Sequence, residues 1–170
     1  EEHHLLREAG GELGVIGATG RGSLEHFGLS PAEVPALVGT LGKAFGSFGA
    51  FVAGSADLIE TLVQRARSYI YTTALPPAVA AATRAALAVS IEESWRRERV
   101  LALTRRFREL AREAKLPLAD SETPIQPVLL GEADAAVRAS RQLLDQGLFV
   151  AAIRPPTVPA GTSRLRITLS

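Results

Sequence analysis

The sequence predicts an α/β protein in which a glycine-rich segment with short buried strands precedes a unit of helices and sheet that begins near residue 75. Short apolar runs at 36–40 and 50–53, bounded by glycines, are typical of buried strands. Apolar residues then recur at helical spacing between residues 55 and 116. After residue 125 the pattern changes to strand, helix, strand and strand.

The composition excludes several classes of function. The chain has 170 residues, of which 46% are hydrophobic, so it can bury a sizeable core. Its 19 basic and 18 acidic residues give a formal charge of +1, which indicates neither a nucleic-acid nor an anionic-membrane partner. No apolar run approaches the roughly 20 residues of a membrane-spanning helix, and no signal-peptide pattern is present, so we expect a cytoplasmic protein. Without cysteine there are no disulfides or thiolate metal sites, and His3 and His4 are too few to indicate a metal site.

The first half of the chain predicts strands and one helix. The run 13–17 is apolar enough to be the end of a buried strand, and strands are expected at 36–40 and 50–53. Ser55 can cap a helix whose apolar residues recur at helical spacing, and we expect this helix to end near Tyr69.

The second half predicts two long helices and a small sheet. Pro76 and Pro77 can start a helix with small residues on one face, which suggests close packing. A charged helix follows Trp95 and ends at Pro117. Strand patterns at 125–130, 148–153 and 164–169 surround a helix at 132–146 that Gly147 stops. In the last strand Arg164 and Arg166 alternate with apolar residues and are expected to point outward.

Lys43 stands in a segment with the layout that a Schiff-base enzyme needs. Glycines at 42, 46 and 49 allow the main chain to approach a bulky planar ligand, and the hydroxyl of Thr40 lies three residues before the amine. The only other lysine is Lys115, and arginine, which supplies every other cation, cannot form an imine. A lysine in a glycine-rich turn is more often a solvated turn residue, so this pattern alone leaves both interpretations open.

Four stretches of the chain resemble the α-oxoamine synthases, a family of pyridoxal-phosphate (PLP) enzymes, and they match the family in order and spacing. They are Gly17-Ala-Thr-Gly-Arg-Gly-Ser23 with Glu25-His-Phe-Gly28, Thr40-Leu-Gly-Lys-Ala-Phe-Gly46, Tyr69-Ile-Tyr-Thr-Thr-Ala-Leu-Pro-Pro77, and Ile153-Arg-Pro-Pro-Thr-Val-Pro-Ala-Gly-Thr-Ser-Arg-Leu-Arg-Ile-Thr-Leu169. The last stretch, with Ile125-Gln-Pro127, resembles the branch of the family that serves biotin synthesis.

The resemblance implies a fold-type I PLP-dependent transferase in the α/β class. Residues 1–74 would be part of the large PLP-binding domain, and residues 75–170 would be linking helices and a smaller α+β C-terminal domain that lacks its final helix. It also implies a homodimer with active sites at the subunit interface. The implied reaction is a decarboxylating condensation of L-alanine with a pimeloyl thioester.

The resemblance assigns roles to residues in the second and third stretches. Lys43 would bind the cofactor covalently and later move the α-proton, and Thr40 would bind the cofactor phosphate. Thr72 and Thr73 would reach the phosphate held by the neighbouring subunit. For these two threonines a helix cap or turn before Pro76 is the alternative.

The resemblance assigns substrate binding to the last stretch. Arg154 would clamp the amino-acid carboxylate, a task suited to the planar guanidinium, and Thr157 would line the same pocket. Without the resemblance, Arg154 would be interpreted as a structural arginine beside two prolines.

The chain departs from the family before its Gly-Arg-Gly motif. The family carries an Asp-Glu-Ala-His motif there, whose aspartate pairs with the pyridine nitrogen, but this chain reads Arg7-Glu-Ala-Gly-Gly-Glu-Leu13. Residues 1–12 fit no part of the family pattern, and the upstream half of the large domain is absent from the sequence. We therefore expect a fragment that is inactive by itself. A sister α-oxoamine synthase and a non-catalytic paralogue stay open as alternatives.

Overall fold

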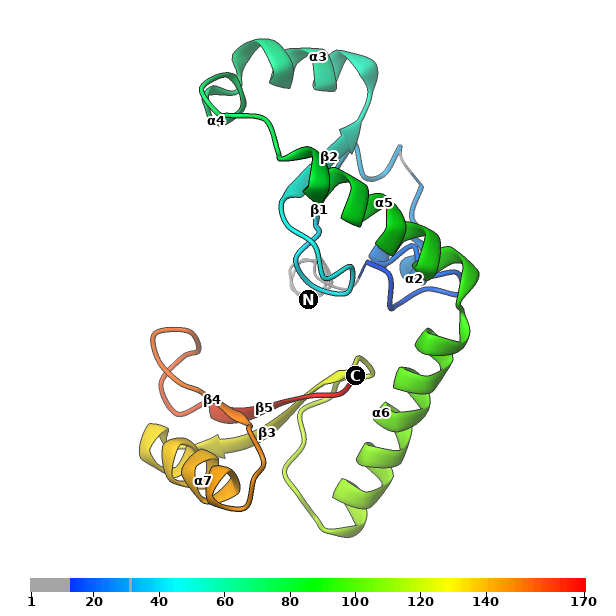
Figure 1. Cartoon of the computed structure of the whole chain (residues 1–170). Coiled ribbons are helices and arrows are strands. Elements are labelled where there is room, and N and C mark those ends of the chain that lie inside the picture. The colour runs from blue at the N-terminus through cyan, green and yellow to red at the C-terminus, as the bar shows by residue number, and fades with distance from the viewer. Residues whose placement is uncertain (1–12, 31) are drawn as a thin grey trace. The chain divides into compact units, whose positions relative to one another are not determined.

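The computed structural model describes residues 13–30 and 32–170, and the chain divides after Arg97 into two compact units (Figure 1). Both units contain helices and strands, so the predicted α/β class is confirmed. None of the helices in the described residues is long and apolar enough to cross a lipid bilayer. The predicted division of the whole enzyme into domains at residue 74 stays a prediction.

The first unit is built on a hairpin of two antiparallel strands, β1 (Ala36–Thr40) and β2 (Ala50–Gly54). Val38 lies opposite Val52, and Thr40 lies opposite Ala50. Among the described residues, four helices lie wholly in this unit: α2 (Ser23–Phe27), α3 (Ala56–Arg65), α4 (Arg67–Ile70) and α5 (Pro77–Glu92). Both predicted strands are confirmed, because the glycines around the two apolar runs let the chain reverse between them.

The prediction of a strand end at residues 13–17 is wrong. Gly14 and Gly17 have φ angles of +89° and +86°, outside the range of an extended strand. The chain instead folds back on itself: the amide of Gly14 donates to the carbonyl of Gly20 over 2.9 Å, and the amide of Gly22 donates to that of Ile16 over 2.9 Å. Residues 13–22 therefore form a glycine-rich loop.

The predicted helix from Ser55 to Tyr69 starts as expected and breaks early. The Ser55 side chain accepts a hydrogen bond from the amide of Leu58 over 3.2 Å, which confirms the N-cap. Ala66 has an extended backbone, with φ of −74° and ψ of 105°, so α3 ends at Arg65 and α4 begins at Arg67. The apolar periodicity continues through this break, which is why the sequence pattern did not reveal it.

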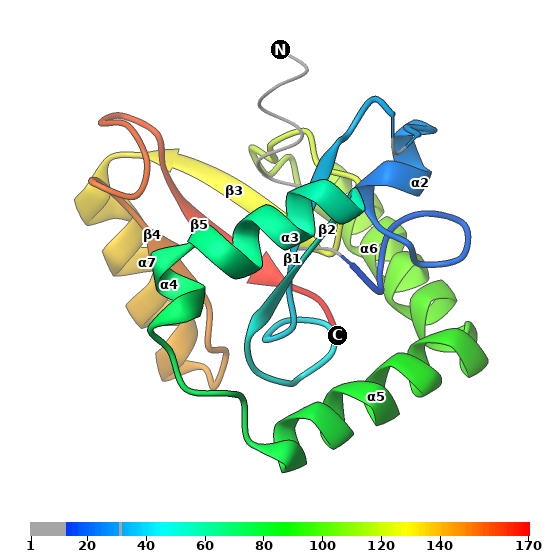
Figure 2. The ribbon, with the colours of Figure 1, turned by 90° about the horizontal axis from the view of Figure 1, so that it is seen from above.

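Helix α5 begins at Pro77, in agreement with the prediction from its two prolines. It is rich in alanine and apolar around most of its circumference, yet it contains no buried residue in the described chain. Figure 2 shows α5 running past the loop that joins β1 to β2.

The second unit packs one helix on a three-stranded antiparallel sheet. Strand β5 (Ser163–Thr168) lies between β3 (Ile125–Gly131) and β4 (Ala151–Ile153), and α7 (Ala133–Asp145) covers the sheet (Figure 1). Most of α6 (Trp95–Glu113) also belongs to this unit. The most buried apolar residues of the described chain lie here: Ala111, Val128, Ala136 and Leu165. The predicted alternation in the last strand is confirmed, because Leu165 is buried while Arg166 is exposed and Arg164 is half-buried.

The predicted strand at 148–153 is shorter than expected. Only residues 151–153 pair with β5, starting from Ala151 opposite Arg166. The Ser140 hydroxyl donates to the carbonyl of Val150 over 2.6 Å, so a side chain of α7 takes the place of a strand partner there. Phe149 is left 87% exposed, which no buried strand would allow.

Candidate active site

The turn between β1 and β2 carries Lys43. Its ends are closed by two backbone hydrogen bonds, from Leu41 N to Gly49 O over 2.9 Å and from Ser47 N to Leu41 O over 3.0 Å. Within the turn the amide of Gly46 donates to the Lys43 carbonyl over 2.8 Å. Gly46 and Gly49 have φ angles of +56° and +96°, so two of the three glycines that the sequence analysis selected are required by the backbone itself.

The amine of Lys43 lies beside the hydroxyl of Thr40, three residues earlier in the chain. Lys43 Nζ donates to Thr40 Oγ1 over 3.3 Å, and both side chains are exposed. Thr40 is the last residue of β1, which fixes its backbone in the hairpin. The structure therefore brings together the amine and the hydroxyl that the sequence analysis grouped.

The lysine-bearing turn is attached to α5 by a contact that the sequence analysis did not find. Ser47 Oγ lies 2.6 Å from Thr83 Oγ1 and 3.5 Å from the carbonyl oxygen of Val79. Thr83 additionally donates to the Val79 carbonyl over 2.9 Å within its own helix. The sequence offered one signal for this contact: Thr83 places a hydroxyl inside a helix rich in alanine.

Glu25 accepts hydrogen bonds from one part of the glycine-rich loop, residues 17–22. Its carboxylate accepts hydrogen bonds from the amides of Thr19 and Arg21 over 3.0 and 3.1 Å, and from the Thr19 hydroxyl over 2.9 Å. Desolvation by the surrounding chain raises the pKa of Glu25, but these hydrogen bonds and the nearby charge of Arg21 together lower that pKa below its ordinary value. Glu25 belongs to one of the four stretches that resemble the family, but the sequence alone assigned no role to its carboxylate.

A cavity of about 940 Å³ opens between three segments of the first unit. Its walls come from residues 18–21 of the glycine-rich loop, from Leu41 and Phe45 of the lysine-bearing turn, and from one side of α5. Leu41 and Phe45 each stand two residues from Lys43 along the chain, so one end of the cavity lies at the turn that carries the amine.

Thr72 and Thr73 lie on the exposed connection between α4 and α5. Neither threonine caps α5, whose N-cap residue is Pro76 without a side-chain hydrogen bond. Across residues 13–30 and 32–170, no hydrogen bond joins either threonine to Lys43.

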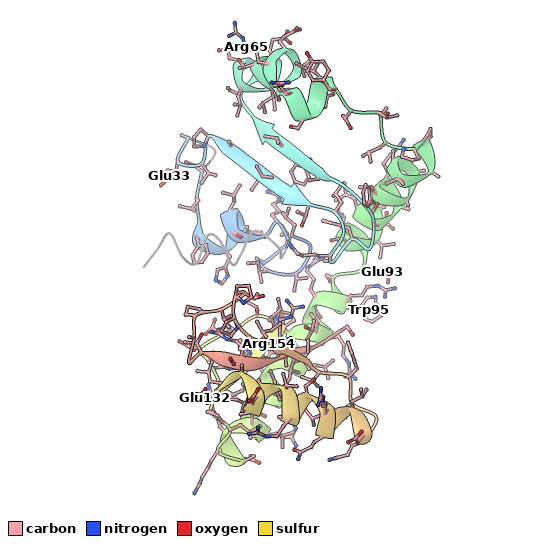
Figure 3. The ribbon with its side chains drawn as sticks, turned by 90° about the vertical axis from the view of Figure 1, so that its left-hand side faces the viewer. Glu33, Arg65, Glu93, Trp95, Glu132 and Arg154 are labelled. Carbon is pink, nitrogen blue, oxygen red and sulfur yellow. The ribbon has the colours of Figure 1, made fainter. Side chains whose placement is uncertain are left out.

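Arg154 and Thr157 lie in the second unit, on the turn that follows β4. The amide of Thr157 donates to the carbonyl of Arg154 over 3.0 Å, and both side chains are exposed (Figure 3 labels Arg154). The guanidinium is therefore available to a ligand. The motif at Arg7–Leu13, where the family's aspartate and histidine are not recognisable, falls largely on residues 1–12, outside the described chain.

The sequence pattern of the aminotransferase class I and II family matches residues 12–170, nearly the whole chain. The chain belongs to this family. Two curated relatives of the chain within it are both named 8-amino-7-oxononanoate synthase. The one from Thioalkalivibrio sulfidiphilus is 61% identical over 98% of this chain, and the one from Nitrosococcus oceani is 61% identical over 93%. These names confirm the resemblance to the α-oxoamine synthases.

The chain spans about two fifths of the length of these curated relatives, since it covers 42% of each. Whatever the intact aminotransferase class I and II enzyme does, this sequence contains only part of its residues.

Solved structures of class I and II relatives agree in fold. An 8-amino-7-oxononanoate synthase from Francisella tularensis matches with a TM-score of 0.85 and 34% identity, covering 95% of this chain and 47% of its own. A serine palmitoyltransferase from Sphingomonas wittichii matches with a TM-score of 0.86 and 31% identity, covering 94% and 40%. Another such structure, described as carrying the PLP internal aldimine, matches with a TM-score of 0.87, covering 94% and 40% at 31% identity. The predicted fold-type I architecture is confirmed by these relatives.

Proposed function

We propose that the intact polypeptide is a PLP-dependent acyltransferase, an 8-amino-7-oxononanoate synthase of biotin synthesis. It would condense L-alanine with a pimeloyl thioester on coenzyme A or an acyl carrier protein. The observation that carries the proposal is the Lys43 amine beside Thr40 on an open glycine-rich turn. This turn belongs to a chain about 60% identical to relatives of that name.

The turn around Lys43 has room for the cofactor. A Cβ added at Gly46 would meet no atom within 4 Å, and one added at Gly42 would meet only the Ser47 carbonyl, at 3.5 Å. A planar ring could therefore lie against this main chain without displacing a side chain. The amine is also exposed, as a group that must reach an aldehyde needs to be.

Lys43 and Thr40 would carry out the central steps. PLP, when bound, supplies the electron sink that stabilises negative charge on the α-carbon of the amino acid. The Lys43 amine would hold the cofactor by its aldehyde carbon, and after the amino acid replaces it there, would move the α-proton as base and then as acid. Thr40 would offer its hydroxyl to the cofactor phosphate, the role that the family assigns to this position.

Arg154 would orient the amino acid by its carboxylate. Its planar guanidinium can form two parallel hydrogen bonds with a carboxylate, and the Thr157 amide bonded to its carbonyl holds the turn in place. After Lys43 removes the α-proton, the α-carbon would bond to the thioester carbonyl carbon and the thiol carrier would depart with a proton. The carboxylate would then leave as CO2, and Lys43 would return a proton to the α-carbon. Thr157 would line the same pocket.

Thr72 and Thr73 extend the proposal to a homodimer. Their exposed connection carries no side-chain hydrogen bond in the described chain, so both hydroxyls are available to a group from outside. We assign them to the cofactor phosphate of the neighbouring subunit, which would place each active site at the interface. A cytoplasmic location is part of the same proposal.

The serine palmitoyltransferase structures support a second candidate, because they match the fold as well as the Francisella synthase does. A sister enzyme would use serine or glycine with a different acyl thioester. The curated relatives at 61% identity favour the alanine and pimeloyl pair.

The test is a substrate panel on the intact polypeptide. Alanine, glycine and serine are each assayed with pimeloyl-, succinyl- and palmitoyl-CoA, using wild type, Lys43→Ala and, as a matched control, Lys115→Ala. We expect product from alanine with pimeloyl-CoA, its loss in Lys43→Ala and its retention in Lys115→Ala. Preference for another pair would favour a sister enzyme, and no turnover by a PLP-loaded wild type would favour a non-catalytic paralogue. The 170-residue chain alone is expected to be inactive.

A further inference from the structure

The cavity of the first unit is apolar along its length. Leu41, Phe45 and Phe51 line it from the hairpin, and Leu87 and Ile91 line it from α5. Within these 170 residues Leu87 and Ile91 are 49% and 69% exposed although they face a concave surface, so an apolar ligand there would remove their side chains from water. Its volume lies within the range of small-molecule sites.

One end of this cavity is cationic. Arg97 lies against the loop that covers this end: its Cδ and Nε would lie 3.0 and 3.1 Å from a Cβ added at Gly20. One Arg97 N–H donates to the carbonyl of Ser90 at the end of α5, which fixes the direction of the side chain. Arg21 also lines the cavity, and none of the lining residues is acidic. The guanidinium of Arg97 has five donors, so the bond to Ser90 leaves others for a ligand.

We propose that this cavity binds the acyl chain of the thioester substrate and that Arg97 binds a carboxylate at the far end of that chain. The inference rests on the proposed function, and it names the residues that would select a dicarboxylic acyl group. The thioester end would lie at the turn that carries Lys43, and the methylene groups would lie along Leu87 and Ile91.

The dimensions of the cavity suit such a chain. Thr83, next to the lysine-bearing turn, and Ile91, near the arginine end, are eight residues apart on α5, which corresponds to about 12 Å along the helix axis. An extended pimeloyl chain is shorter than this span, so it fits without folding. A monocarboxylic chain of equal length would leave the Arg97 guanidinium partly desolvated and without an anionic partner, which is costly.

Binding can be measured without turnover. Monomethyl pimelate and methyl heptanoate, whose esters stand in for the thioester, differ only in the terminal carboxylate. Isothermal titration calorimetry follows their binding to the PLP-loaded intact polypeptide and to Arg97→Gln. We expect monomethyl pimelate to bind wild type at least about tenfold more tightly than methyl heptanoate, and Arg97→Gln to remove the difference.

Arg96→Gln is the matched control. Arg96 is adjacent, pairs with Glu93 over 2.7 Å and stacks on the ring of Trp95 at 4.7 Å, and it does not line the cavity (Figure 3 labels Glu93 and Trp95). Arg96→Gln should keep the preference for monomethyl pimelate. Leu87→Trp, which fills the middle of the cavity, serves as a second variant in case Arg97→Gln does not fold. It should weaken binding of both esters at least about tenfold.

Activity then separates this inference from the proposed function. With pimeloyl- and heptanoyl-CoA, Arg97→Gln should lower the ratio of the two kcat/KM values about tenfold or more, mainly through KM for pimeloyl-CoA. An unchanged ratio, or equal loss with both substrates, would overturn the inference while leaving the role of Lys43 intact. Absence of any binding of monomethyl pimelate to the PLP-loaded wild type would also overturn the inference. Absence of covalently bound PLP on Lys43 of the wild type would instead overturn the proposed function.

Discussion

Ser47 and Thr83 meet through their hydroxyls at 2.6 Å, and this contact joins the lysine-bearing turn to the middle of α5. The two residues are 36 positions apart in the chain, so the contact is tertiary. It gives the turn a support other than its own hairpin, and it stands next to the cavity proposed for the acyl chain.

The first prediction concerns this support. A double-mutant cycle of Ser47→Ala and Thr83→Ala should give a coupling of about 1 kcal/mol in the free energy of unfolding, because a part-buried hydrogen bond contributes about that much. Thr61→Ala is the control, since the Thr61 hydroxyl donates to the carbonyl four residues earlier, as that of Thr83 does, but within α3 only. Coupling of Ser47 to Thr61 should be near zero. Equal coupling in both cycles would show that the contact with Thr83 is not specific.

The second prediction concerns the pH dependence of the glycine-rich loop. The pKa of Glu25 in the folded chain lies below its ordinary value of 4.5. Ionised Glu25 therefore stabilises the loop at pH above 4.5, and this contribution is lost as the pH falls through the lower, folded pKa. NMR titration of the Thr19 and Arg21 amides should show a midpoint below 4.5.

The controls for this titration are two substitutions that change charge equally. Glu25→Gln should abolish the titration of the two amides, whereas Glu60→Gln, on the exposed surface of α3, should leave it unchanged. A wild-type midpoint at or above the ordinary value would contradict the assigned hydrogen bonds.

The third prediction concerns the buried polar cluster of the second unit. Gln126 is fully buried; it accepts from Arg108 over 2.9 Å and donates to the carbonyls of Ser121 and Thr123 over 2.8 and 2.6 Å. Gln126→Leu should lower the free energy of unfolding by about 1–3 kcal/mol, because Arg108 loses one of its buried acceptors and the Thr123 carbonyl loses its donor. Chemical denaturation measures this loss. Gln142→Leu, at an exposed position, should change the free energy of unfolding by less than about 0.5 kcal/mol. Equal losses in the two variants would contradict the hydrogen bonds assigned to Gln126.

The fourth prediction compares two glycines of the hairpin. A Cβ at Gly39 would overlap the Phe51 ring and the Leu13 side chain, whereas a Cβ at Gly42 would make an ordinary contact. Gly39→Ala should therefore destabilise the protein by about 1–3 kcal/mol, and Gly42→Ala should cost under about 1 kcal/mol. Thermal unfolding of both variants distinguishes them, and the reverse order of stability would contradict the packing of Phe51.

Much of the fold could be predicted from local patterns. Strand 36–40, strand 50–53, the cap at Ser55 and the alternation around Leu165 all follow from the spacing of apolar residues and from turn residues. The break at Ala66 could not be predicted, because nothing in the spacing of the apolar side chains changes there. Residues 13–17 were misassigned because positive φ angles at Gly14 and Gly17 outweigh the strand preference of Val15 and Ile16.

In the candidate site, only the contacts between residues close in sequence could be predicted. Lys43 and Thr40 are close in the chain, so their proximity follows from a short turn. Ser47 with Thr83, and Gly20 with Arg97, come together only through tertiary packing, which no local spacing encodes. The carboxylate of Glu25 is an intermediate case, since its partners lie four and six residues away but depend on the glycine conformations between them.

The most direct test of the central claim is borohydride reduction of the PLP-loaded intact polypeptide, followed by peptide mass spectrometry. The segment described here contains two lysines, so Lys115 serves as an internal control for Lys43. We predict a reduced pyridoxyl group on the peptide that contains Lys43 and none on the peptide that contains Lys115. An unmodified Lys43 in a protein that retains the cofactor would contradict the account.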